Sequence, residues 1–341
     1  MGLTISDVAN SAGVSTATVS RYLNQPHLVS PDRQERIAKT IAELNYVPNN
    51  MAKALTTNQT TTIGVIVPDI NNVYYPPIVR GIEDYLTECG FVSFLCNTDQ
   101  NLSREKRYIT TLRSQQVAGM IFVGSRPSNP SLSDHLAELR RSLPVLMVND
   151  DMLDGKVSSI GSQEAGGIYQ AIKYLHSLGH RNIAFISSSV PLNTYIQKER
   201  GFCHAMEHLG LGPAGQWIFR DAKEYEAGGF SAMKKIMELS KAPSAVVAAT
   251  DQMAVGAVHA LLEHGYRMPR DYSVVGYSNS CISSTTYPGI TTIDQHGYEL
   301  GKQAAQMLVQ IIHGAEDDLS AHYLDTKLVI RKSSGFCMTG E

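Results

Sequence analysis

Apolar residues in the first 25 positions recur at the spacing of helices rather than strands. Thr4 precedes Asp7 at the spacing of a capping box, and Ser15 can cap a second helix over 16–23. Gly13 lies between the two helices and tolerates the positive φ that a tight turn requires. Their apolar side chains can meet in a small core that holds Val8, Ala12, Val14, Val19 and Leu23.

The outward side of the second predicted helix carries short polar side chains and one arginine. Small residues let a helix approach base edges closely in the DNA major groove, where arginine often reads guanine. This face consists of Ser15, Thr16, Ala17, Thr18, Ser20 and Arg21. The pattern indicates a helix-turn-helix. Spacing alone leaves an ordinary helical hairpin with a solvated face open, because such hairpins are common.

A third helix completes this small domain. Ser30 is a suitable N-cap and Pro31 a suitable first residue, and the predicted helix runs to about Asn45. Its inward face holds Ile37, Ile41 and Leu44. Residues 1–47 are therefore predicted to form a helical headpiece.

The headpiece is followed by a stretch with few core-forming residues. The segment 50–55 is too short to hold a helix on its own, and the run 56–62 is polar. Residues 48–60 are therefore predicted to be a conditional helix and a linker.

From Ile63 the pattern changes to short apolar runs, rich in β-branched residues, that alternate with helical stretches. The predicted strands lie at 63–68, 91–96, 119–124, 144–149, 182–187, 245–250 and 273–277. The predicted helices lie at 78–89, 105–116, 132–143, 166–178, 199–209, 229–239, 252–264 and 298–312, before a last strand at 323–330. This alternation predicts an α/β core of two doubly wound parallel sheets, each covered by helices on both faces.

Polar side chains follow most of the predicted strands. Open parallel sheets bind ligands outside the carboxyl ends of their strands. Those ends hold Asp69, Asn97, Ser125, Asn149, Asp150, Asp151, Ser187, Thr250, Asp251 and Ser278. Two such sheets facing each other would enclose a small polar molecule. The alternative is that these residues are polar only because loops are polar.

The composition describes an ordinary globular chain of 341 residues, of which 43% are hydrophobic and 18% charged, with a net charge of −3. This charge excludes a basic DNA coat but not a small DNA-reading domain, because the local field decides. Five scattered cysteines without CxxC spacing predict reduced thiols and no zinc site. We see no membrane-spanning run and no signal peptide, so we expect a cytoplasmic protein.

The sequence contains no enzyme motif such as a Walker loop, HExxH or GxSxG. The stretch 210–215, GLGPAG, matches GxGxxG but follows a predicted helix, and Pro213 would disrupt a helix starting there. We interpret it as a helix stop and turn. No catalytic residue, metal ligand or cofactor is therefore predicted.

Several stretches, in collinear order from Leu3 to about Ser334, resemble the lactose/galactose-repressor family of bacterial regulators. They are GVSTATVSRYLN, ELNYVPNNMAKAL, IGVIVPDI, IVRGIEDYL, LGHRNIAFI, DQMAVGAVHALLEHGYRMPRDYSVVGY and PGITTI. The resemblance implies a helix-turn-helix headpiece, a hinge helix and a core like a periplasmic sugar-binding protein. Such a core dimerises and binds an effector in its cleft.

In cores of this kind the chain crosses between two subdomains three times. The resemblance implies a core over 61–341. Its first subdomain would be about 61–159 with 291–321, and its second about 160–290 with 322–341. Because no leucine heptad follows the core, the tetramer-forming extension of some members is not expected.

The resemblance also assigns DNA contacts. Thr16, Ala17 and Arg21 occupy base-reading positions. Tyr46 resembles a phosphate contact, and Leu55 resembles the hinge residue wedged into a minor-groove step. The DNA-binding residues implied in this way are Thr4, Ser15, Thr16, Ala17, Thr18, Ser20, Arg21, Asn24, Tyr46, Asn49, Ala52, Lys53 and Leu55. Their partner would be a double-stranded, pseudo-palindromic operator bound by a homodimer.

The implied effector-binding residues are Tyr74, Tyr75, Ser125, Asp150, Thr194, Lys198, Tyr225, Thr250 and Ser278. Ser278 replaces an aspartate that is frequent in the family, and Lys198 replaces a frequent arginine. A carboxylate lost beside a retained cation points to a sugar phosphate or sugar acid, with a neutral sugar as the alternative. Asp150 and Asp151 oppose an anion.

We therefore predict a sequence-specific transcription regulator, a repressor, whose operator affinity is controlled by a small carbohydrate-derived effector. The alternative is the solute-binding protein of a sugar transporter, which shares the two-lobed core. Such a protein requires export, and the headpiece and the missing signal peptide argue against it. No membrane partner is expected.

Overall fold

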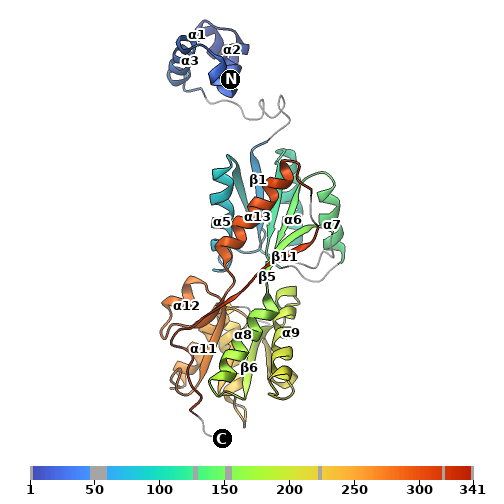
Figure 1. Ribbon diagram of the computed structural model, residues 1–341, viewed down its shortest axis with the longest axis vertical. Helices are drawn as coiled ribbons and strands as arrows, with labels where there is room; N and C mark the ends of the chain where they lie inside the picture. Colours follow the sequence, from blue (N-terminus) through green and yellow to red (C-terminus); the bar gives the residue numbers. More distant parts are fainter. Residues whose placement is uncertain are drawn as a thin grey trace. The chain divides into compact units, whose positions relative to one another are not determined.

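The computed structural model describes residues 3–46, 60–125, 130–149, 156–221, 225–316 and 319–338. Contacts divide the chain into two compact units, residues 1–60 and 61–341. We call the first the headpiece and the second the core unit; both are drawn in Figure 1. The predicted headpiece boundary at 47 and the hinge helix within 48–60 fall at residues outside the described ranges and remain predictions.

The headpiece contains α1 (Ile5–Ala12), α2 (Thr16–Asn24), the 3₁₀ turn η1 (Pro26–Leu28) and α3 (Pro31–Leu44). Asp7 accepts hydrogen bonds from the backbone amide and the hydroxyl of Thr4, both at 2.7 Å. The Thr18 amide donates to Ser15 Oγ at 3.2 Å. Gly13 ends α1 with a φ of 63°. The predicted helix starts and the turn between them are confirmed.

Each helix of the headpiece contributes one fully buried aliphatic side chain: Val8, Val19 and Ile37. The other predicted core residues pack around these three, with Ala12 buried and Val14, Leu23, Ile41 and Leu44 half-buried. Arg36 adds a polar link, since its Nη2 donates to the Ala12 carbonyl at 2.6 Å. This bond fixes α3 against the turn that follows α1.

The core unit holds two six-stranded sheets, one in each of two lobes (Figure 1). The sheet of the first lobe has the order β11-β5-β4-β3-β1-β2 and is parallel throughout. Its strands are β1 (Thr62–Val67), β2 (Val92–Asn97), β3 (Gly119–Val123), β4 (Val145–Val148), β5 (Ser158–Ser162) and β11 (Ala321–Leu324). One face packs against α5 (Tyr75–Glu88) and α13 (Gly297–Ile312), and the other against α6 (Leu102–Ser114) and α7 (Pro130–Arg140).

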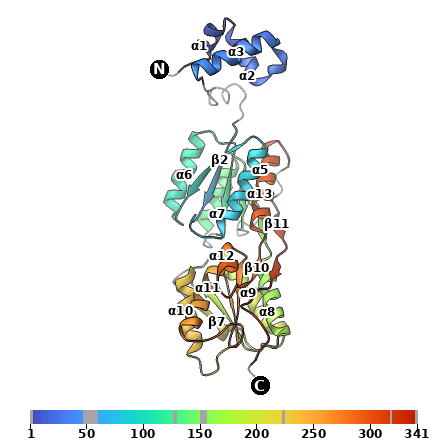
Figure 2. The same ribbon diagram turned by 90° about the vertical axis from the view of Figure 1, so that its left-hand side faces the viewer.

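The sheet of the second lobe has the order β12-β10-β9-β8-β6-β7, and only β12 is antiparallel. Its strands are β6 (Ile183–Ser188), β7 (Ile218–Asp221), β8 (Ala245–Ala248), β9 (Ser273–Ser278), β10 (Thr291–Asp294) and β12 (Lys327–Val329). Its helices are α8 (Glu164–Ser177), α9 (Asn193–His208), η2 (Gly215–Trp217), α10 (Tyr225–Met237), α11 (Asp251–Glu263) and the short α12 (Cys281–Thr285). The pairs α8–α9 and α10–α11 lie on opposite sides of the sheet (Figure 2). The predicted pair of doubly wound sheets is confirmed.

The chain crosses between the lobes after β5, after β10 and after β11. The crossings follow Ser162, Asp294 and Leu324, within a few residues of the approximate boundaries 159/160, 290/291 and 321/322 that the resemblance implies. The short strands β5 and β10 were missed because they bury polar side chains such as Ser158 and Thr291 and lack an apolar signature. The strand predicted at 323–330 is two strands, β11 and β12, which pair in different sheets.

Smaller differences concern element ends. α5 begins at Tyr75 rather than 78, because Pro76 and Pro77 fit the first turn of a helix, where their missing amide hydrogens have no partner to lose. α6 begins at Leu102 rather than 105, since Asn101 caps it by accepting a hydrogen bond from the Arg104 amide at 3.0 Å.

His180 ties the C-terminal segment to the second lobe. Its ring is 2% exposed. Nδ1 lies 2.8 Å from Ser244 Oγ, and Nε2 lies 3.0 Å from both Ser273 Oγ and the Gly335 carbonyl. Burial lowers the pKa of His180 below its ordinary value of 6.5, the bond to Gly335 raises it, and Arg181 lowers it further. The net direction is downward, so the folded protein keeps this ring neutral.

We predict that the core unit loses stability as the pH falls below about 6.5. Between that value and the lower pKa of the folded state, His180 binds a proton in the unfolded chain but not in the folded protein, so acid favours unfolding. Thermal unfolding of wild type and His180→Gln between pH 5 and pH 8 measures this effect. The melting temperature of wild type should fall more steeply with acid than that of His180→Gln. Exposed His313→Gln is the control and should follow wild type; equal slopes for all three proteins would remove His180 from the pH dependence.

Candidate nucleic-acid interface and effector cleft

The outward face of α2 is open to solvent. Ser15, Thr16, Ala17 and Arg21 are exposed, and Thr18 and Ser20 are half-buried. Thr18 Oγ1 lies 2.8 Å from Ser15 Oγ, so these hydroxyls order each other at the start of the helix. Thr4 is also exposed, at the start of α1. The structure therefore presents the predicted base-reading side chains together on one short helix.

Other predicted DNA contacts lie elsewhere. Tyr46 is only 8% exposed and packs into the headpiece core, so little of its surface is available to DNA. Its assignment as a phosphate contact stays a prediction. The backbone of Asn24 ends α2, but the position of its side chain is outside what the structure describes. Asn49, Ala52, Lys53 and Leu55 also lie outside the described residues, and their roles remain predictions.

A pocket in the core unit lies at the carboxyl ends of strands from both sheets; we call it the central pocket. All the predicted effector-binding residues that the structure describes line it: Tyr74, Tyr75, Ser125, Thr194, Lys198, Tyr225, Thr250 and Ser278. Asp150 lies outside the described ranges. Its neighbour Asn149 lines the pocket, together with Glu164, Asp251 and Gln295 from the crossings and the second lobe.

Lys198 reaches the pocket from α9 with 4% of its side chain exposed. Its Nζ donates to the Ala249 carbonyl at 3.0 Å, lies 3.4 Å from Glu164 Oε2, and sits 4.1 Å from the centre of the Tyr277 ring. Burial lowers the pKa of Lys198, and Glu164 raises it again. The predicted cation is thus present at the pocket, but its charge is already paired.

Glu164, the partner of Lys198, starts α8 directly after a lobe crossing. Its Oε1 accepts hydrogen bonds from Thr194 Oγ1 at 3.2 Å and from Gln295 Nε2 at 3.0 Å. Its Oε2 is buried and accepts no hydrogen bond. Glu164 was not predicted as a pocket residue, because an acidic residue in the first turn of a helix is ordinary. The only available signal was its position just after a strand that was itself missed.

Asp251 is held by the protein rather than presented to a ligand. It is 1% exposed and accepts hydrogen bonds from the Ser280 amide and hydroxyl and from Thr292 Oγ1, at 2.7, 2.8 and 2.5 Å. Burial raises the pKa of Asp251, and these hydrogen bonds lower it. A Cβ at Gly276 would lie 2.4 Å from Asp251 Oδ1, so only glycine fits there. Asp251 therefore fixes the loop that carries Ser278.

Tyr74 and Tyr75 stand edge to face, with ring centres 5.3 Å apart. The Tyr74 hydroxyl accepts a hydrogen bond from Asn149 Nδ2, and Asn149 Oδ1 accepts one from the Ser162 amide at 3.1 Å. Burial raises the pKa of Tyr74 well above its ordinary value, with Glu164 acting in the same direction. Tyr74 is therefore a neutral hydrogen-bonding group at the pocket, while Tyr75 is buried in the first lobe.

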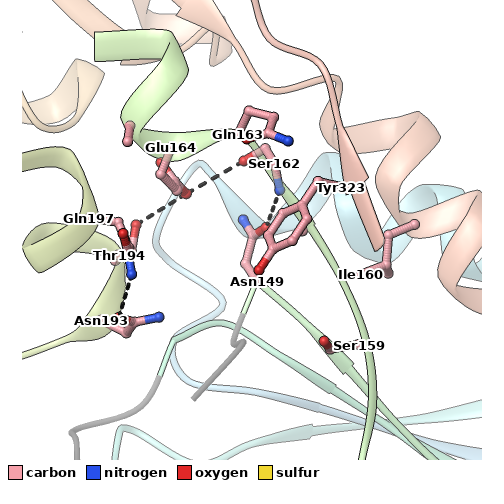
Figure 3. Close-up of a pocket in the computed structure, with 12 residues that line it drawn as sticks. Asn149, Ser159, Ile160, Ser162, Gln163, Glu164, Asn193, Thr194, Gln197 and Tyr323 are labelled. Carbon is pink, nitrogen blue, oxygen red and sulfur yellow. Dashed lines mark hydrogen bonds between the residues drawn. The ribbon is translucent and has the colours of Figure 1, made fainter. Parts of the chain in front are cut away.

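A second cavity of about 170 Å³ adjoins the central pocket beside β5; we call it the hinge pocket. Figure 3 shows Glu164 and Thr194 joined by a hydrogen bond on one side, with Asn149 and Tyr323 on the other. Asn149, Glu164 and Thr194 line both pockets. The remaining polar groups of the hinge pocket are neutral: Ser159, Ser162, Gln163, Asn193, Gln197 and Tyr323.

Within the described ranges, no group of three or more His, Cys, Asp or Glu side chains could hold a metal ion. None of the helices in those ranges is both long and apolar enough to cross a membrane.

Two sequence profiles match the chain: "Bacterial regulatory proteins, lacI family" over residues 4–49, and "Periplasmic binding protein-like domain" over residues 172–334. The HTH-type transcriptional regulator RegA of Clostridium saccharobutylicum is 34% identical over 98% of this chain and 100% of its own. Catabolite control protein A of Priestia megaterium is 32% identical with the same coverage.

Solved structures agree. The lac repressor dimer bound to operator and the anti-inducer ONPF has a TM-score of 0.87 at 28% identity, covering 98% of this chain and 100% of its own. A complex of the regulator CelR with cellobiose has a TM-score of 0.73 at 27% identity, covering 97% and 100%.

A helix-turn-helix headpiece followed by a two-lobed core with a polar cleft defines a DNA-binding regulator rather than a transporter's binding protein. The chain belongs to the LacI family of bacterial regulatory proteins, which confirms the resemblance seen in its sequence. It is a transcription regulator of that family.

We predict that Asp251→Ala lowers the unfolding free energy of the core unit by roughly 2–4 kcal/mol, because it leaves several buried donors without an acceptor. Urea unfolding at pH 7 measures the loss. The matched control is Asp271→Ala, which removes a partly exposed carboxylate beside Arg267 and should change stability by less than about 1 kcal/mol. Equal losses in the two variants would contradict the structural role of Asp251.

Proposed function

We propose that this chain is a cytoplasmic, homodimeric repressor that binds a pseudo-palindromic operator and responds to a carbohydrate-derived effector in the central pocket. One observation carries the proposal: the same chain contains an exposed helix-turn-helix face and a polar pocket lined by residues of two lobes. No enzymatic activity is proposed, because the relatives are regulators and the pocket's polar groups hold one another in hydrogen bonds.

The headpiece supports binding through shape more than through charge. Arg33, Arg36 and Lys39 on α3 are accompanied by Asp32, Glu35 and Glu43, and Lys39 lies 3.9 Å from Glu43. The described headpiece has as many acidic as basic side chains, so a single copy gains little from phosphate neutralisation. Two headpieces reading two half-sites, about one helical turn apart, would supply the missing affinity.

The core unit offers a surface for a second copy. β2 is an edge strand of the first sheet, and Val92, Phe94 and Leu95 on it are 58%, 48% and 46% exposed. An exposed apolar edge strand is an aggregation hazard unless something covers it. A dimer that buries β2 would remove this hazard and present two headpieces to one operator.

The central pocket suits a hydroxyl-rich molecule. Its lining combines hydroxyls, amides and aromatic rings from both lobes, such as Ser125 and Tyr74 from the first and Thr194 and Thr250 from the second. A ligand that contacts both lobes favours the lobe arrangement in which those contacts are best. Solved relatives hold cellobiose and, in a regulator from Enterococcus faecium with a TM-score of 0.70 and 28% identity, ribose. By analogy, we assign the sugar to this pocket.

The direct test combines two measurements on the full-length protein. Selection from random double-stranded DNA should return a pseudo-palindrome. A thermal-shift screen of sugars should raise the melting temperature with a small subset, because a ligand of the folded state stabilises it. A selected site without two-fold symmetry would contradict dimeric operator binding.

We predict that Arg21→Ala weakens binding to the selected operator by about 1–3 kcal/mol while changing binding to random DNA far less, because Arg21 reads a base edge. Fluorescence anisotropy on both DNAs measures the two losses. Lys39→Ala, on α3 and paired with Glu43, is the matched control and should leave operator preference intact. Equal weakening on both DNAs by Arg21→Ala would mean that Arg21 contacts phosphate instead.

A further inference from the structure

The charge at the central pocket is arranged differently from what the sequence suggests. Among the described residues that line the central pocket, Lys198 is the only basic one. The described residues that line the hinge pocket include no basic residue. Lys198 is buried. Its ammonium group pairs with Glu164 Oε2, donates a hydrogen bond to the Ala249 carbonyl and lies over the Tyr277 ring. A ligand anion entering the pocket would therefore meet no free cation among these residues.

Glu164 lines the central pocket and pairs with Lys198 there. Thr194 and Gln295 donate to Oε1 and fix the carboxylate, while Oε2 has no hydrogen-bond donor. Asp251, the other acidic residue of the lining, is also buried. Two acidic side chains and one basic side chain thus make the described part of the lining neutral to negative.

We propose that Glu164 is the specificity-determining residue of the central pocket, selecting an uncharged, hydroxyl-rich effector and refusing its phosphorylated or acidic form. The proposal rests on the proposed function and names the effector class of the same pocket. It reverses the sequence-based preference for an anionic effector, which assumed that Lys198 presents a free charge.

The physical reason is the cost of bringing charge to a buried carboxylate. Glu164 lines the central pocket, so a sugar hydroxyl can donate a hydrogen bond to its carboxylate, and a hydrogen bond to a charged acceptor is stronger than one to a neutral acceptor. A phosphate or carboxylate group would instead add a negative charge near Glu164 in a site that water screens poorly. It would also compete with Glu164 for Lys198 and leave the carboxylate unpaired.

The test uses Glu164→Gln, which removes the charge but keeps a side-chain carbonyl that can accept from Thr194 and Gln295. The matched control is Glu199→Gln, one residue beyond Lys198. It removes the same charge from an ion pair in which Arg220 Nη2 lies 2.5 Å from Glu199 Oε2. Calorimetry at low ionic strength measures the binding of glucose, glucose 6-phosphate and inorganic phosphate to full-length wild type and both variants. A panel of other neutral hexoses is included with each protein.

Wild type and Glu199→Gln should bind both phosphates at least tenfold more weakly than Glu164→Gln does, because only Glu164→Gln frees Lys198. Glu164→Gln/Lys198→Met should lose the gained phosphate binding, which places the new site at Lys198. Two outcomes overturn the proposal: wild type binding glucose 6-phosphate more tightly than any neutral hexose, or Glu164→Gln binding phosphate no better than Glu199→Gln.

Two readouts separate this proposal from the broader one. Urea unfolding shows whether Glu164→Gln is folded, and if it is not, the wild-type comparison of phosphate with neutral sugar still decides. Operator binding is measured on the same preparations. Operator binding that no ligand alters would contradict effector control, whereas the phosphate selectivity tests Glu164 alone.

Discussion

One set of hydrogen bonds joins two of the three segments in which the chain crosses between the lobes. The arrangement of the two lobes depends on these bonds. Gln295, just after β10, donates from Nε2 to Ser162 Oγ at 2.7 Å and to Glu164 Oε1 at 3.0 Å, just after β5. All three residues are buried or nearly so. Because each lobe contains segments from both sides of the crossings, neither lobe can complete its sheet alone. Glu164 and Gln295, which join these crossings, also line the central pocket.

This arrangement gives a physical route from ligand to lobe geometry. Glu164 contacts Thr194 at the start of α9, Lys198 one turn further on, and Gln295 at the opposite crossing. A hydroxyl that hydrogen-bonds to Glu164 competes for the carboxylate oxygens that make all three contacts. Closely packed interiors shift between discrete arrangements rather than deforming gradually. A small change at Glu164 can therefore bias the angle between the lobes.

Much of the fold follows from the sequence, because its local signals agree with its final contacts. Ser15 caps α2, Gly13 supplies the positive φ, and the runs that became β1, β3 and β8 are almost wholly apolar and buried. The strands β5 and β10 were missed because they bury serines and threonines, whose partners lie far away in the sequence. Periodicity cannot report such partners.

The pocket, too, could be predicted only in part. Strand ends and family resemblance named Tyr74, Thr250 and Ser278, which the structure brings to one pocket. The charge state of Lys198 was beyond prediction, since its partner Glu164 is 34 positions away on another helix and no pattern connects the two. The burial of Tyr46 in the headpiece core was not predicted, and its assignment as a phosphate contact stays a prediction.

We expect ligand binding in the central pocket and operator binding by the headpiece to be linked in one chain. The most direct test is the thermodynamic cycle between them, measured with the neutral sugar that most raises the melting temperature. Anisotropy gives the operator affinity with and without saturating sugar, and calorimetry gives the sugar affinity with and without operator. Both affinities should change by the same factor, roughly 5- to 150-fold. An operator affinity that stays unchanged at saturating sugar would contradict this linkage.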